Sequence, residues 1–241
     1  MDHRTYRFFA ETLPSQAGES LPLSVEEGHH ALHVLRLRAG DAVEVFDGRG
    51  GRCRGRLAPG KKGAVAIVVE EVFAPRQRPS PLVHLAFAVP KGKRLDWLLE
   101  KATELGAASL QPVIFERSVA GGDELSDNKR QRWLGHCVAA AKQSGLDYLP
   151  DIRPPVSLAE FLGGFCGLGL FGDLGPEAET AGEAMSRRGG RDVALLVGPE
   201  GGLGDSEREA LLSAGLAGIR LGRTVLRVET AAIALLAVCQ L

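Results

Sequence analysis

The sequence has few of the features that mark disulfide-rich, metal-binding or membrane proteins. Four cysteines are spread along the chain: Cys53, Cys137, Cys166 and Cys239. None forms a Cys-x-x-Cys pair, which argues against a zinc knuckle or a disulfide framework and fits a reducing cytosol. The longest uncharged apolar run, 230–241, has the length of a buried helix and not of a membrane span. Residues 1–11 mix charges with aromatics, unlike a signal peptide. We therefore expect a cytoplasmic protein that does not enter a membrane.

The sequence also lacks a strong charge of one sign. Lysine and arginine total 29 against 30 acidic residues, so the overall balance indicates no nucleic-acid partner. One stretch, 48–62, has basic residues and no acidic ones: Arg49, Arg52, Arg54, Arg56, Lys61 and Lys62. It could neutralise phosphates, or it could be a solvated basic hairpin. Aromatic residues make up only 5% of the chain, so extensive base stacking is not expected.

The pattern of the chain changes near residue 80. Residues 1–72 show one helical stretch at 26–37 and several short alternating segments with glycine turns, which favours a small β-barrel. Residues 73–81 are rich in proline and predict a linker. From 82 to 241, apolar strand-like runs alternate with helical spacings, and Ser157 and Glu160 form a capping box. This second part predicts an α/β domain with a largely parallel sheet.

A Gly-Pro-Glu-Gly-Gly turn at 198–202 directly follows an apolar strand. Glycines let the backbone approach a ligand closely, and ligands of open α/β sheets bind at the carboxyl ends of the strands. The turn matches neither a P-loop nor a dinucleotide fingerprint, and the acidic residues that follow at 205–207 disfavour a phosphate. The segment therefore predicts a small-ligand turn, the alternative being a tight strand-to-helix connection.

A second charged loop, 221–230, lies between the last expected strand and an apolar helix. It contains Arg223, Arg227 and Glu229. Charges beside a buried element need partners or a function. Arg227 and Glu229 could pair at the helix start or could act at a site.

Taken together, these two segments resemble the SPOUT methyltransferases, and most closely the RsmE family of uracil-N3 methyltransferases acting on small-subunit (16S) ribosomal RNA. The similarity rests on Gly-Pro-Glu-Gly-Gly, then Leu221-Gly222, then Leu-Arg-x-Glu-Thr at 226–230. Further similar stretches lie at 29–41, 91–93, 100–106, 116–118 and 143–145. Two positions depart from the usual pattern: Gly204 stands where the family often has Ser, and Val228 where it has Thr.

The resemblance implies a homodimer with an N-terminal PUA-like barrel and a C-terminal trefoil knot that binds S-adenosylmethionine. The cofactor residues it implies are Phe171, Gly172, Gly198, Pro199, Glu200, Gly201, Gly202, Leu221, Gly222 and Leu226. The candidate catalytic residues are Arg227, which would stabilise a uracil anion, and Glu200 and Glu229, which could accept a proton.

RNA binding is expected from basic residues of the barrel and of the 91–94 segment. The candidates are Arg4, Arg7, His30, Arg36, Arg49, Arg52, Arg54, Lys91, Lys93 and Arg94. His30 and His33 have the spacing of a metal pair but no apparent third ligand, so no metal is expected. The expected partner is ribosomal RNA or the small ribosomal subunit. Two alternatives stay open: a SPOUT enzyme that methylates a ribose 2′-hydroxyl or another base, and a non-catalytic ribosome assembly factor.

Overall fold

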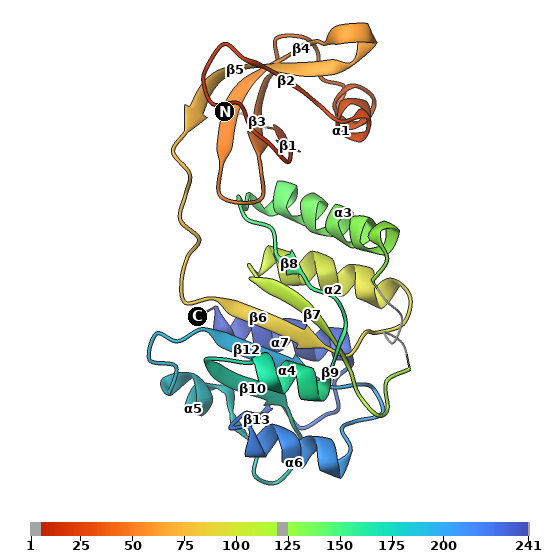
Figure 1. Ribbon diagram of the computed structural model, residues 1–241, viewed down its shortest axis with the longest axis vertical. Coiled ribbons are helices and arrows are strands. Elements are labelled where there is room, and N and C mark those ends of the chain that lie inside the picture. The colour runs from red at the N-terminus through yellow and green to blue at the C-terminus, as the bar shows by residue number, and fades with distance from the viewer. Residues whose placement is uncertain (1–5, 120–124, 241) are drawn as a thin grey trace. The chain divides into compact units, whose positions relative to one another are not determined.

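The computed structural model describes residues 6–119 and 125–240 (Figure 1). Backbone contacts divide the chain into two compact units. The first contains the described residues up to Arg78 together with Ala141–Leu149, and the second contains Pro79–Ala140 and the residues from Pro150 onward. Nothing in the hydrophobic pattern of the sequence indicated that 141–149 would join the N-terminal unit.

The first unit is built on a five-stranded sheet with the order β1-β3-β4-β5-β2. Its strands are β1 (Tyr6–Phe9), β2 (Ser20–Pro22), β3 (Ala42–Phe46), β4 (Arg52–Pro59) and β5 (Val65–Phe73). The β1–β3 pair is parallel and the other pairs are antiparallel. Alternation along β4 buries Cys53 and Leu57 and turns its arginines outward, as expected of a strand with one buried face.

A short helical segment precedes β3. Helix α1 (Val25–His29) begins at Ser24, whose hydroxyl accepts a hydrogen bond from the Glu27 amide at 3.1 Å. It continues as a π-helical turn, His30–Val34. The single helix expected at 26–37 is therefore shorter and changes its hydrogen-bonding pattern halfway. Arg36 then adopts a left-handed backbone with φ 57°.

The second unit contains an eight-stranded sheet in which every pairing is parallel, which confirms the α/β expectation. The order is β11-β13-β10-β12-β6-β7-β8, and β9 also pairs with β7. The strands are β6 (Val83–Phe87), β7 (Ser109–Ile114), β8 (Asp151–Ile152), β9 (Val156–Ser157), β10 (Leu168–Gly172), β11 (Glu179–Thr180), β12 (Val193–Val197) and β13 (Ala217–Arg220). The central strands are apolar throughout because both faces of the sheet are covered.

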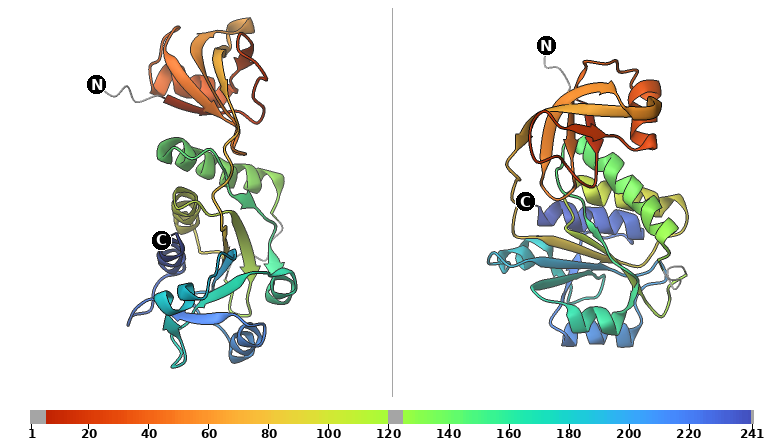
Figure 2. Two further views of the ribbon diagram at one scale, coloured as in Figure 1. Left: turned by 90° about the vertical axis from the view of Figure 1, so that its left-hand side faces the viewer. Right: turned by 45° about the horizontal axis from the view of Figure 1, so that its top comes forward.

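Helices cover the two faces of this sheet (Figure 2). The helices of the unit are α2 (Lys93–Glu104), α3 (Asp127–Ser144), α4 (Leu158–Gly164), α5 (Ala181–Ser186), α6 (Asp205–Ser213) and α7 (Val228–Cys239). The last residues of α3, from Ala141, belong to the first unit. α2 and α7 pack against each other, and α7 also contacts β12 and β6. On the opposite face, α4 and α6 bury Leu158 and Leu211 against Phe171 and Leu196. Among the described residues, no helix combines the length and apolarity that crossing a membrane requires.

Candidate functional site

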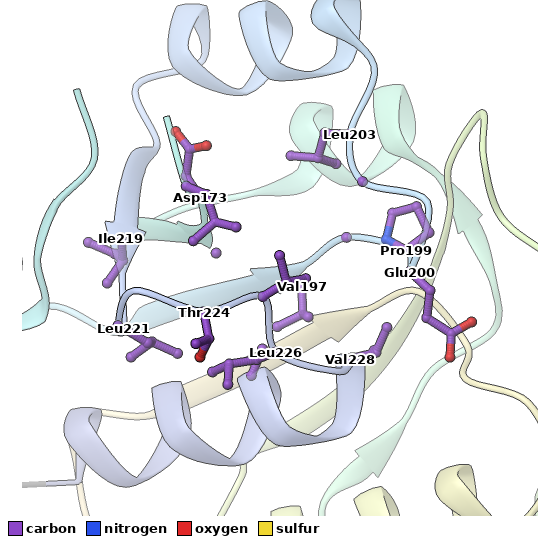
Figure 3. A pocket seen from close by; sticks show the side chains of 17 residues that line it. Asp173, Val197, Pro199, Glu200, Leu203, Ile219, Leu221, Thr224, Leu226 and Val228 are labelled. Carbon is purple, nitrogen blue, oxygen red and sulfur yellow. The ribbon is translucent and has the colours of Figure 1, made fainter. Parts of the chain in front are cut away.

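A cavity of about 150 Å³ lies where the carboxyl ends of β10, β12 and β13 meet (Figure 3). These strands are neighbours in the sheet, so the segments that follow them converge at one edge. The cavity is lined by Gly172, Asp173, Leu174, Val197, Gly198, Pro199, Glu200, Gly202, Leu203, Ile219, Leu221, Gly222, Thr224, Val225, Leu226, Val228 and Ala231. Most of these side chains are aliphatic, which suits the apolar part of a small ligand.

Glycines shape the wall of the cavity after β12. A Cβ on Gly198 would lie 2.8 Å from Cδ2 of Leu203, so the end of β12 and the Leu203 side chain approach more closely than a larger residue allows. Gly202 has φ +75°, a conformation that favours glycine. After β13, a Cβ on Gly222 would meet nothing within 4 Å, so this backbone faces open space. The turns therefore expose main chain to whatever occupies the cavity.

Asp173 lines the cavity at the end of β10, and its carboxylate points toward α6 (Figure 3). Its Oδ2 accepts hydrogen bonds from Nε and Nη2 of Arg208 at 3.1 and 2.8 Å, and its Oδ1 accepts one from the Gly175 amide at 3.0 Å. Burial alone would raise the pKa of Asp173, but the hydrogen bonds and the charge of Arg208 outweigh it and lower that pKa. The carboxylate is thus held ionised and fixed in orientation.

The Gly-Pro-Glu-Gly-Gly turn is held from its outer side by charged residues. Nη1 of Arg117 donates to the Gly201 carbonyl at 3.1 Å. The Glu207 carboxylate accepts from the amides of Glu116 and Gly204 at 2.7 and 2.8 Å. A Cβ at Gly204 would lie 2.8 Å from Oε2 of Glu116, so Gly at this position leaves room for that side chain.

Arg94 connects the turn to the start of α7. Its Nη1 donates to Oε1 of Glu200, and its Nε lies 3.9 Å from Oε1 of Glu229. Glu229 is 7% exposed, and its Oε2 has no hydrogen-bond partner among the residues that the structure describes. Figure 3 shows the Glu200 side chain pointing away from the cavity. Arg94 therefore pairs with two carboxylates on different segments, the 198–202 turn and α7.

The structure brings together most of the residues that the sequence marks for a cofactor. Eight of them line the cavity: Gly172, Gly198, Pro199, Glu200, Gly202, Leu221, Gly222 and Leu226. Phe171 and Gly201 do not. Phe171 is fully buried in the apolar core, and a Cβ on Gly201 would meet Cβ of Arg117 at 3.2 Å.

The predicted catalytic residues fall in different surroundings. Glu200 lines the cavity, whereas Arg227 and Glu229 do not. Arg227 is exposed at the N-cap of α7, and Glu229 faces Arg94. Val228, between them, is buried in the cavity wall. Nine lining residues were not among the predicted cofactor residues: Asp173, Leu174, Val197, Leu203, Ile219, Thr224, Val225, Val228 and Ala231. For Asp173 the available signal was a charged residue directly after an apolar strand.

Several predicted RNA-binding residues are engaged inside the first unit. Arg7 pairs with Glu44 and Asp147 and donates to the carbonyls of Ala141 and Leu146 at 3.2 and 3.1 Å. The β4 arginines each face a carboxylate: Arg52–Glu44 at 3.7 Å, Arg54–Glu71 at 3.7 Å and Arg56–Glu70 at 2.7 Å.

The remaining candidates differ in exposure. Arg36, Arg49, Lys91 and Lys93 are exposed. His30 is partly buried, with its ring edge-on to Phe8 at 6.5 Å between centroids. Burial, followed by the charge of Lys142, lowers the pKa of His30. Arg4 lies outside the described residues.

Comparison with known proteins finds a matching family for a segment of each unit. Residues 77–240 match the RNA methyltransferase domain family, and residues 23–70 match the RNA methyltransferase PUA domain family. Ribosomal RNA small subunit methyltransferase E of Bacillus subtilis is 30% identical, over 93% of this chain and 92% of its own. The enzyme of the same name from Mycobacterium bovis is 34% identical, over 93% of this chain and 87% of its own.

Solved structures of methyltransferases are also similar to this chain over nearly its whole length. A ribosomal RNA small subunit methyltransferase E from Neisseria gonorrhoeae, bound to S-adenosyl methionine, superposes with a TM-score of 0.86 at 29% identity, covering 98% of this chain and 97% of that one. A putative methyltransferase from Legionella pneumophila, in complex with the same cofactor, gives 0.88 at 34% identity, with coverage of 98% and 97%. This chain therefore belongs to the RNA methyltransferase family that includes the ribosomal RNA small subunit methyltransferases E.

Proposed function

We propose that the protein transfers a methyl group from S-adenosylmethionine to N3 of a uridine in small-subunit ribosomal RNA. The observation that carries this proposal is the cavity at the ends of β10, β12 and β13, which is built from the two segments that resemble the SPOUT cofactor motifs. The relatives named for the small-subunit RNA, and the two related structures that hold the cofactor, support it.

The residues of the cavity fit this cofactor chemically. Aliphatic side chains such as Val197, Ile219 and Leu226 would pack against the adenine ring, and exposed main chain at Gly198 and Gly222 would satisfy its polar edges. Asp173, whose carboxylate accepts hydrogen bonds from Arg208, would fix the end of β10 beside the cofactor. S-adenosylmethionine, when bound, supplies an electrophilic methyl group.

The remaining catalytic task is to position the uracil and to favour loss of its N3 proton. We assign Arg227 to this task, because its exposed guanidinium follows the cavity-lining Leu226 and its planar donors match the carbonyl oxygens of an imide. Glu229 points to Arg94 and so acts on the geometry of the site and not directly on the base. The site residues proposed for the cofactor are the eight that line the cavity.

In the proposed organisation, residues 1–72 bind RNA, 73–81 link the units, and 82–241 bind the cofactor. The C-terminal segment would form the trefoil knot of the SPOUT class, and two chains would form a cytoplasmic homodimer. The proposal of a knot rests on the SPOUT-like motifs at 198–202 and 221–230.

Methyl transfer measured in a single turnover tests the assignment of Arg227. With cofactor and RNA saturating, Arg227→Ala should slow the transfer by about 10²–10³-fold, the usual cost of removing one donor to a developing anion. Its affinity for S-adenosylmethionine, measured by titration calorimetry, should stay within about twofold of the wild type because Arg227 does not line the cavity. Near-full turnover by the variant would contradict the assignment. A folded protein that binds the cofactor but modifies no RNA would favour a non-catalytic assembly factor.

A further inference from the structure

The helical segment before β3 packs with its small residues inward and its large ones outward. Gly28 and Ala31 are buried, and a Cβ on Gly28 would lie only 3.3 Å from Cγ2 of Val65 in β5. Val25 and Leu32, by contrast, are 90% and 42% exposed. A helix that covers a core normally shows the opposite arrangement. Exposed apolar side chains grouped in this way indicate a binding surface.

The outward residues follow one face of the segment. Val25, His29, Leu32 and His33 recur at intervals of three and four along the helical segment, which favours one side of it. Arg36 follows just after the segment ends, and all five residues are exposed. We call these five residues the histidine face. The rings of His29 and His33 lie 4.7 Å apart between centroids and are tilted by 36°. They form an exposed pair of flat π-surfaces of the kind on which nucleobases stack.

The backbone at the end of the histidine face is unusual. In the π-helical turn, the amide of Leu35 donates to the carbonyl of His30 at 2.9 Å. Arg36 then has φ 57°, which is uncommon for a residue other than glycine. Both π-helical turns and left-handed non-glycine residues are concentrated at functional sites. Here they occur together where the helical segment ends, and Arg36 is three residues after His33.

The free positive charge of the first unit also points to this face. Arg7 and the three β4 arginines are paired with carboxylates, and Lys142 is paired with Glu27 at 2.8 Å. Among the described residues, no carboxylate pairs with Arg36. Arg38, Arg49 and Lys61 are also exposed. Arg38 is two residues after Arg36, whereas Arg49 and Lys61 lie outside the segment that carries the ring pair. The one exposed acid beside the histidine face is Glu26, within the described part of this segment.

We propose that the histidine face binds a single-stranded segment of RNA, with bases stacked on His29 and His33 and a phosphate at Arg36. Rings, a neighbouring aliphatic side chain and an unpaired guanidinium are the combination with which proteins hold unstacked RNA. The proposal deepens the proposed function, on which it rests, by naming the part of the first unit that would hold the substrate. In this proposal the histidine face, and not Arg7 or the β4 arginines, makes the principal RNA contacts.

Fluorescence anisotropy with a labelled single-stranded oligouridine tests the proposal. His29→Ala/His33→Ala should weaken binding about tenfold or more, because stacking of even one base is lost. The dependence of affinity on salt should be unchanged in that variant, whereas Arg36→Ala should reduce the salt slope by about one phosphate. His29→Phe/His33→Phe keeps the ring surfaces and should retain most of the affinity. Glu26→Gln should strengthen binding by removing a repulsive charge.

Arg56→Ala is the matched control, because Arg56 is exposed, basic and in the same unit but paired with Glu70. It should bind as the wild type does. Equal affinity of the wild type and the double alanine variant for oligouridine would overturn the proposal. So would unchanged RNA affinity combined with impaired modification of intact small subunits, since that result would mean the face docks on a protein. If the wild type methylates no RNA but the oligouridine results are as expected, the proposed function is wrong and the RNA-binding role of the histidine face still holds.

Discussion

Substitution of Arg94 should destabilise the second unit by removing the charge next to a buried carboxylate. Glu229 is 7% exposed, and the Nε of Arg94 lies 3.9 Å from its Oε1. Two unit charges at about 4 Å interact by about 4 kcal/mol at an effective dielectric constant of about 20. The Arg94 side chain is 42% exposed, so solvent screens a large part of this. We therefore expect Arg94→Ala to lower the free energy of unfolding by about 1–2 kcal/mol, below the 3–5 typical of fully buried pairs.

Urea unfolding followed by tryptophan fluorescence measures this loss in the right part of the molecule. Both tryptophans, Trp97 and Trp133, belong to the second unit. Lys93→Ala is the matched control, because Lys93 is the exposed neighbour of Arg94 on α2. It should unfold as the wild type does.

A second substitution distinguishes two causes of the lost stability, the unpaired charge of Glu229 and the lost packing of the arginine side chain. Glu229→Gln keeps the shape of the side chain and removes its charge. In the Arg94→Ala background it should recover most of the lost stability, because no unpaired buried charge remains. The reasoning would be refuted if Arg94→Ala unfolded like the wild type, or if Glu229→Gln only added to its loss.

Three further predictions concern the cavity and the core. Gly222→Val, which projects methyl groups into the space beside the 221–226 loop, should weaken S-adenosylmethionine binding about tenfold or more by calorimetry; unchanged affinity would remove this loop from the site. Burial alone would raise the pKa of Asp173, but its hydrogen bonds with Arg208 lower that pKa in the folded protein. The ionised carboxylate therefore stabilises the fold above about pH 4, and this contribution is lost as the pH falls through the lower pKa of the folded state. Acid unfolding of Asp173→Asn should accordingly depend less on pH than that of the wild type, and an equal dependence would contradict the assignment. Burial raises the pKa of Cys53, Cys137 and Cys239 to about 11, whereas Cys166 is exposed. A thiol reagent at pH 8 should label one site rapidly in the native protein and four after denaturation, and rapid native labelling of a second thiol would disprove the packing of the core.

The sequence was informative where the fold depends on local pattern. The apolar strand expected directly before the 198–202 turn is β12, and the short alternating segments expected in 1–72 include β3. The two cofactor motifs were expected to meet because the carboxyl ends of parallel strands share one edge of the sheet, and eight of ten predicted cofactor residues do line one cavity. Two-residue strands such as β9 carry no periodicity and could not be found in this way.

Where residues lie in other surroundings than expected, the cause is a detail that sequence spacing does not carry. Phe171 and Gly172 are adjacent on β10, and consecutive strand residues face opposite sides, so only one of them can reach the cavity. The partners of Arg7 include the Leu146 carbonyl, 139 residues away, so its burial was invisible from its neighbours. The β4 arginines looked free because the carboxylates that face them lie on β3 and β5, and only the strand register reveals the pairs.

The most direct test of the proposed function is transfer of labelled methyl groups from S-adenosylmethionine to RNA of the small ribosomal subunit, followed by mass spectrometry of the modified nucleosides. Small subunits and protein-free RNA, both from cells that lack this protein, should be compared as substrates. The proposed function predicts 3-methyluridine at one position, with the label absent when the protein is omitted. Label on a ribose 2′-oxygen or on another base would contradict the uridine-N3 assignment, and no label on either substrate would contradict the proposed activity itself.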